Sequence, residues 1–174
     1  DEVLLKRTKA YLKKKEDNKA KIIKKREKRR KDLNKSINLI VENDNTPDKE
    51  SLRKMLIMTS WMENRHGHDD DAYNSSYTNS QMQIDNEPLN DLLSKPTRED
   101  TGEPTGDYTD WQKSYFKKMP QYGFNINTVR DSLASDNSNA AMFMSRMHFA
   151  KVPDPMPTGD NYKDYYNYYK KYYN

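Results

Sequence analysis

The chain has 174 residues, of which a third are charged, with a net charge of +4 and a pI of about 9.0. Leu, Ile, Val and Phe together make up only about 15% of it, too little for a comfortable autonomous core and typical of a chain held by partners. No apolar run approaches the roughly 18 residues that a membrane-spanning helix needs. Without cysteine, the chain forms no disulfide and no thiolate zinc site.

Residues 1–36 form a basic segment with 16 Lys and Arg against 6 Asp and Glu, whereas the remaining residues carry 15 against 21. No Gly or Pro occurs from Val3 to about Val41, which predicts one long helix, anchored at both ends by apolar residues and solvated or anion-facing between them. We therefore assign residues 1–45 to a basic helical arm and residues 46–174 to a helical domain.

Clustered cations on a long helix attract phosphate backbones without reading their sequence. DNA, RNA, an acidic protein surface and anionic lipid all fit this pattern, and a merely solvated helix fits it equally well. The candidate binding residues are Lys13, Lys14, Lys24, Lys25, Arg26, Arg29 and Arg30.

A second helix is predicted from about residue 47 to residue 65. Thr46 is expected as its N-cap, Pro47 as its first helical residue and Asp48 as an acid in its first turn. Apolar residues follow at helical spacing, and Gly67 is expected to end the helix.

The stretch SWMENRHGHDDD, at residues 60–71, raises the question of a metal site. Imidazole and carboxylate groups are ligands for zinc and other divalent ions, so His66 and His68 are weak candidates. They converge on one ion only if the backbone is extended, and nothing in the sequence indicates a third ligand. We favour a solvated loop and expect neither a metal nor another cofactor.

Glu63 lies at the predicted C-terminal end of the second helix, where the helix dipole disfavours a negative charge. Trp61 and Met62 are neighbours that can exclude water, and both effects favour the protonated acid near neutral pH. Such a carboxylic acid is suited to protonating a glycosidic oxygen. A surface glutamate at a frayed helix end also fits these physical cues.

The remaining chain is predicted to be helical with interruptions. Met82 and Ile84 flank Gln83 in the alternation of a short strand or extended turn. Short helices are expected after Pro88, after a capping box at Thr109, and at 128–134 and 138–150. A proline break at 153–157 leads into a Tyr-rich C-terminal helix. There Tyr168 is expected to the side of one aromatic face formed by Tyr162, Tyr165, Tyr166, Tyr169, Tyr172 and Tyr173.

The helix MLIMTSWMEN followed by AYNSSYTNSQMQID resembles the lysozyme-like lytic transglycosylase domains of bacteriophage virion-associated proteins. In that pattern an apolar helix ends in the catalytic Glu, and a polar loop and small-residue turn lead into a hydrophobic-Gln-Ile strand. SNAAMFMSRMHFAKVPDPMP followed by YYNYYKKYYN resembles their later helices, so the similarity covers roughly residues 47–174. Asn64, Ser80 and Gln81 depart from the usual Ser, Gly and apolar residue.

The resemblance implies a mostly helical protein with a small lysozyme-like domain and little strand, incomplete or stabilised by partners. Glu63 would be both acid and base on peptidoglycan, with Tyr73 and Tyr77 stacking on sugars and Met82, Gln83 and Ile84 lining the groove. The expected setting is the virion, among other virion proteins.

A competing hypothesis is a non-enzymatic accessory subunit of a ribosome or mitochondrial membrane complex that wraps its partner subunits. The start at Asp1 rather than Met favours a processed or fragmentary chain. It leaves both hypotheses open.

Overall fold

The computed structural model describes residues 1–74 and 81–173, and 67% of these described residues are helical. The expectation of a mostly helical protein is therefore confirmed, and the described residues contain no sheet. The elements are α1 (Glu2–Glu42), α2 (Lys49–Asn64), η1 (Arg65–Gly67), α3 (Asp71–Asn74), α4 (Asn86–Leu93), α5 (Asp110–Phe116), η2 (Met119–Tyr122), α6 (Val129–Ala134), α7 (Ser138–Ala150) and α8 (Tyr162–Tyr172).

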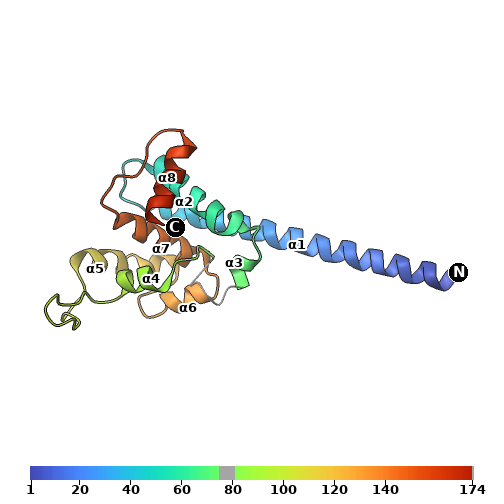
Figure 1. Ribbon diagram of the computed structural model, residues 1–174, viewed down its shortest axis with the longest axis horizontal. Helices are drawn as coiled ribbons and strands as arrows, with labels where there is room; N and C mark the ends of the chain where they lie inside the picture. The colour runs from blue at the N-terminus through green and yellow to red at the C-terminus, as the bar shows by residue number, and fades with distance from the viewer. Residues whose placement is uncertain (75–80, 174) are drawn as a thin grey trace.

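The predicted long N-terminal helix is α1, which leaves the body as a projecting rod with the N-terminus at its far end (Figure 1). Its C-terminal part is buried through Leu33, Ile37, Ile40 and Val41. The N-terminal part is not anchored, contrary to expectation, because no described element reaches it and Leu4 stays 65% exposed. The packed body therefore begins within α1, before residue 46.

Helix α7 is the centre of the body, and its most extensive contact is with α1. It buries residues on every side, as expected of a helix surrounded by others. They include Ala140, Ala141, Met142, Phe143, Met144 and Met147. Because aliphatic side chains are few, methionine and aromatic side chains fill much of the core of the described body. These side chains adapt to irregular spaces.

Helix α8 lies against α2 and the end of α7, where Tyr165 and Tyr169 pack with Met55 and Phe149. The predicted Tyr-rich helix is present, but its buried face is rotated from the expected one. Tyr168 is buried, whereas Tyr162 is 62% and Tyr166 39% exposed. The neighbours that α8 meets, and not the densest Tyr stripe, select its buried side.

Helix α2 begins two residues later than its capping pattern predicts. The N-cap is Asp48, whose carboxylate accepts a 3.0 Å hydrogen bond from the Ser51 backbone N–H, and not Thr46. The charged Asp48 carboxylate competes better than the Thr46 hydroxyl for the free N–H groups at the helix N-terminus. The helix ends at a left-handed Arg65, two residues before the expected Gly67.

A buried ion pair joins α7 to the α1–α2 loop. The Arg146 guanidinium contacts the Asp44 carboxylate through Nε at 2.7 Å and Nη2 at 3.2 Å, and both side chains are largely buried.

None of the helices in the described ranges combines the length and apolar composition that crossing a bilayer requires.

Candidate active site around Glu63

Glu63 is the penultimate residue of α2 and is half-buried, as its position in the sequence predicts. Its Oε1 accepts a hydrogen bond from the Tyr169 hydroxyl, which reaches it from α8. Although 106 residues separate the two side chains, the packing of α8 on α2 brings them together. The carboxyl thus has a partner that its neighbours along the chain do not provide.

Burial raises the pKa of Glu63 above its ordinary value, the Tyr169 hydrogen bond opposes that rise, and the charge of Asp85 adds to it. Burial also raises the pKa of Tyr169, and Glu63 reinforces the effect, so the phenol stays a neutral donor. Because Tyr169 occupies Oε1, a proton on the carboxyl is directed to Oε2. This geometry suits a group that gives up and regains a proton from one oxygen.

The backbone around Glu63 is fixed by the segment at residues 81–84. The Gln83 side-chain amide donates to the Glu63 carbonyl oxygen. The fully buried Asn64 amide donates to the Gln81 carbonyl oxygen at 2.9 Å, and its Oδ1 accepts the Gly67 backbone N–H at 2.8 Å. Asn64 therefore ties the end of α2 to the following loop.

Tyr173 completes this region from the C-terminal end of the described chain. Its hydroxyl donates to the Met82 carbonyl oxygen and lies 2.9 Å from the Ser145 hydroxyl on α7. Its ring stacks on Phe149 with centroids 5.2 Å apart. Tyr169 and Tyr173 are the site residues that sequence reasoning missed, and the only available signal was the phase of the Tyr stripe.

The expected groove residues are placed differently from one another. Met82 and Ile84 are buried, at 0% and 3% exposure, so their side chains support the site from the core side. Gln83 has a left-handed backbone and turns its side chain to Glu63, and no strand forms there. Of the two conformations predicted for residues 82–84, a short strand and an extended turn, the structure therefore has the turn.

Trp61 and Met62 do not exclude water from Glu63 as expected, because they are 50% and 43% exposed. Trp61 instead stacks over His66, with ring centroids 5.5 Å apart. Burial of Glu63 comes with α8, which supplies Tyr169 from the other side. The desolvation anticipated from sequence is therefore present but has a different source.

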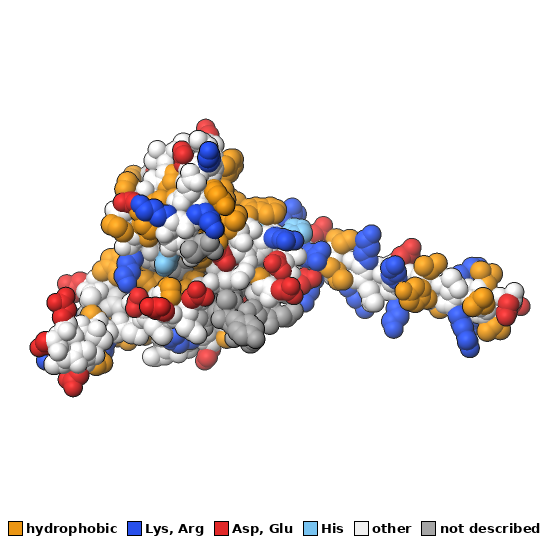
Figure 2. Space-filling model, in the orientation of Figure 1, with side chains coloured by type: hydrophobic (Ala, Val, Ile, Leu, Met, Phe, Trp, Pro, Cys, Tyr) orange, Lys and Arg blue, Asp and Glu red, His pale blue; other side chains and the backbone are white. Residues whose placement is uncertain are grey.

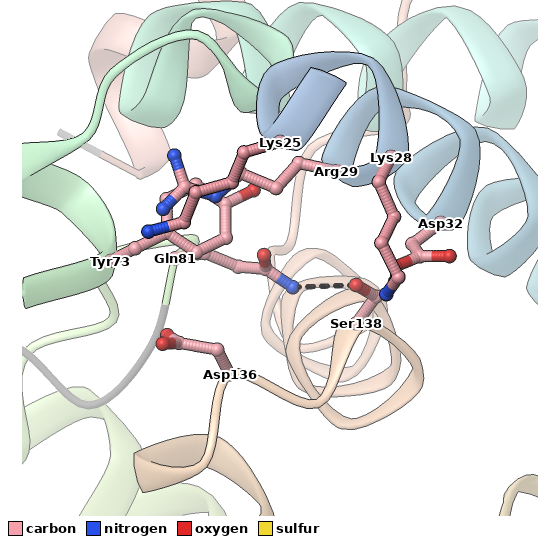
Figure 3. Close-up of a pocket in the computed structure, with 8 residues that line it drawn as sticks. All are labelled: Lys25, Lys28, Arg29, Asp32, Tyr73, Gln81, Asp136 and Ser138. Atoms are coloured by element: carbon pink, nitrogen blue, oxygen red, sulfur yellow. Dashed lines mark hydrogen bonds and ion pairs between the residues drawn. The ribbon is translucent and has the colours of Figure 1, made fainter. Parts of the chain in front are cut away.

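Tyr73, expected to stack on a sugar, lies in a cavity of about 320 Å³ beside α1, where the Arg29 guanidinium covers its ring at 3.8 Å (Figure 3). In this cavity the Gln81 amide donates to the Ser138 hydroxyl at 2.9 Å. The structure thus brings Tyr73 to α1 and not to Glu63. Tyr77 lies outside the described residues.

The basic candidates divide into two groups. Lys13, Lys14, Lys24, Lys25 and Arg30 are exposed on α1. Arg26 and Arg29 instead pair with Asp70 at 3.1 and 2.6 Å, so these two cations already have a partner within the chain. These two ion pairs hold the segment around Asp70 against α1.

His66 is a structural residue. It is buried, with Nε2 2.7 Å from Asn34 Oδ1 and Nδ1 3.0 Å from the Ser60 hydroxyl, so both ring nitrogens have partners. The His68 ring also stacks with Trp61, with ring centroids 6.3 Å apart. No group of three potential metal ligands occurs within the described ranges.

Searches for relatives give this geometry no family context. No family model, curated protein or solved structure matches the chain.

Proposed function

We propose that the chain is a bacteriophage virion protein whose body is a peptidoglycan lytic transglycosylase-like domain, with Glu63 as acid and base. The observation that carries the proposal is the half-buried Glu63 carboxyl at a helix end, with its pKa raised by burial and one oxygen held by Tyr169. The order of sequence features around Glu63 and along α7 and α8 supports the same class.

In the proposed reaction, protonated Glu63 donates its proton to the oxygen that bridges the muramyl and glucosaminyl sugars, and the bond from the muramyl anomeric carbon to that oxygen breaks. The resulting carboxylate then removes the proton from an internal muramyl hydroxyl as its oxygen bonds to the anomeric carbon. The products are a free glucosaminyl hydroxyl and an anhydro-sugar, and Glu63 is again protonated. No second carboxylate nucleophile takes part.

The other residues act on Glu63. The Tyr169 hydroxyl stabilises the carboxylate formed after the first proton transfer, and Gln83 and Asn64 hold the backbone that carries it. Carriage in the virion would deliver such an activity to the cell wall during genome entry. The projecting arm would be the attachment to other virion components.

The second candidate function is a non-enzymatic accessory subunit, and the exposed apolar residues of the arm favour it. A subunit of that kind needs no competent carboxyl. Digestion of purified peptidoglycan by the full chain, with mass analysis of the released sugars, separates the two.

We expect anhydro-muropeptides from the native chain and at least about a hundredfold less from Glu63→Gln, because the amide cannot transfer the proton. The matched control is Glu50→Gln, which changes a 71% exposed carboxylate on the same helix and should leave the yield unchanged. Equal yields from the native chain and Glu63→Gln, or no product from either, would falsify the enzymatic assignment.

A further inference from the structure

Residues 1–25, at the N-terminal end of α1, form a free helical surface. Every one of them is exposed, and the segment extends about 37 Å at 1.5 Å per residue (Figure 1). A helix without tertiary contacts gains nothing from burial, and most helices in proteins depend on such burial. The surface of this segment therefore indicates what covers it.

Apart from Val3, the large apolar side chains of the free segment occur in three adjacent pairs, at 45 to 65% exposure. Figure 2 shows hydrophobic side chains at intervals along this rod among Lys and Arg. The pairs are Leu4 with Leu5, Tyr11 with Leu12, and Ile22 with Ile23. Their spacings of 7 and 11 residues are close to two and three helical turns, so all three pairs share one face.

The same face continues into the body. Leu4, Ile22 and Ile40 are each 18 residues apart, which is five helical turns, and so are Leu5, Ile23 and Val41. Ile40 and Val41 are buried in the core. In the body this face packs against α7 and α2, and in the arm it meets solvent. The arm thus carries a packing face of the kind that helices present to other helices.

The charge of the arm indicates the chemistry of its partner. Residues 1–25 carry ten Lys and Arg against four Asp and Glu. Lys15 and Lys19 lie on the apolar face itself, three and seven residues after Leu12. An anionic lipid surface would have to accommodate these two ammonium groups in the middle of its apolar contact, and a phosphate backbone would leave the apolar pairs uncovered.

A second copy of the arm is also disfavoured, because its net positive charge would face another of the same sign. A helix with apolar residues opposite the three pairs and carboxylates opposite Lys15 and Lys19 satisfies every group on the face. We propose that residues 4–23 dock, through this face, against an acidic amphipathic helix of a partner protein. The inference does not depend on Glu63 or its chemistry.

The test measures binding of the full chain to a synthetic acidic amphipathic peptide that spans residues 4–23, with Leu opposite the apolar pairs and Glu opposite the lysines. A peptide with Lys in place of those Glu residues is the charge control. Titration calorimetry at near-physiological salt should show binding of the acidic peptide and none of the basic one.

Two matched variants locate the contact. Leu5→Ala/Leu12→Ala/Ile23→Ala removes apolar surface while keeping a strong helix former, and should weaken binding of the acidic peptide at least about tenfold. Lys6→Ala/Lys21→Ala changes the opposite face and should alter it less than about threefold. Circular dichroism verifies that both variants keep the native helix content.

Four outcomes would overturn the proposal. They are no binding of the acidic peptide, equal binding by the apolar triple variant, self-association of the native chain through the same residues in sedimentation, and tighter binding to double-stranded DNA or anionic vesicles than to the peptide. Loss of DNA binding in Lys6→Ala/Lys21→Ala, with the apolar variant unaffected, would assign the arm to phosphate recognition instead.

Discussion

Gly67, at the end of η1, packs closely against α1, and replacing it with Ala tests that contact. Its φ is +90°, in the left-handed region that favours glycine. A Cβ there would lie 2.9 Å from the Arg29 Cβ and 3.0 Å from the Arg30 backbone nitrogen. Because one of these atoms belongs to the backbone of a long helix, the clash cannot be relieved by a side-chain rotation.

The magnitude follows from two separate costs. Forcing Ala into a left-handed backbone costs about 1–2 kcal/mol. Separating α1 from the loop adds an overpacking cost of about 1–3 kcal/mol. We therefore expect Gly67→Ala to lower the free energy of unfolding by about 2–5 kcal/mol.

Gly123 provides the matched control, since its φ is +93° and an added Cβ would meet nothing within 4 Å. Gly123→Ala should carry the backbone cost alone, about 1–2 kcal/mol. Both replacements restrict the unfolded chain equally, so that effect cancels in the comparison. Urea unfolding followed by circular dichroism gives both values. Equal losses for the two variants would refute the close approach of Gly67 to α1.

Three further predictions concern other groups. Arg146→Ala leaves the Asp44 carboxylate buried without its partner and should cost about 3–5 kcal/mol in urea unfolding at pH 7, and a loss below 1 kcal/mol would contradict a buried pair. Burial lowers the pKa of His66 in the folded chain, so the unfolded state binds more protons below pH ~6.5 and stability should fall as the pH drops from there. His66→Gln should reduce that slope in urea midpoints, and an unchanged slope would count against it. Tyr169→Phe removes the hydrogen bond that lowers the pKa of Glu63, so that pKa should rise in a carboxyl NMR titration, and no change would exclude the pairing.

The helices were largely predictable because they depend on local pattern. The absence of Gly and Pro from Val3 to Val41 predicts α1, and the apolar spacing after Pro47 predicts α2 with Glu63 near its end. The Thr109 capping box is also confirmed, since both of its hydrogen bonds to Gln112 are present. These features are decided within a few residues of one another.

The surroundings of Glu63 were not predictable, because its partner comes from another helix. Glu63 and Tyr169 meet only after α8 packs on α2, and seven Tyr within twelve residues leave the buried side of α8 open. Tyr73 shows the same limit, since its aromatic ring fits sugar stacking as well as the observed contact with Arg29. Chemistry read from residue types identified the carboxyl but not the groups around it.

The continuity of α1 has a consequence for how the molecule is oriented. One uninterrupted hydrogen-bond ladder joins the free arm to the helix segment that is buried in the body. Each residue added between Ile23 and Arg29 would turn the body by about 100° about the helix axis and move it by about 1.5 Å, whereas seven would nearly restore its facing. The number of residues in this part of α1 therefore sets both the distance and the rotation of the Glu63 site relative to whatever holds the arm.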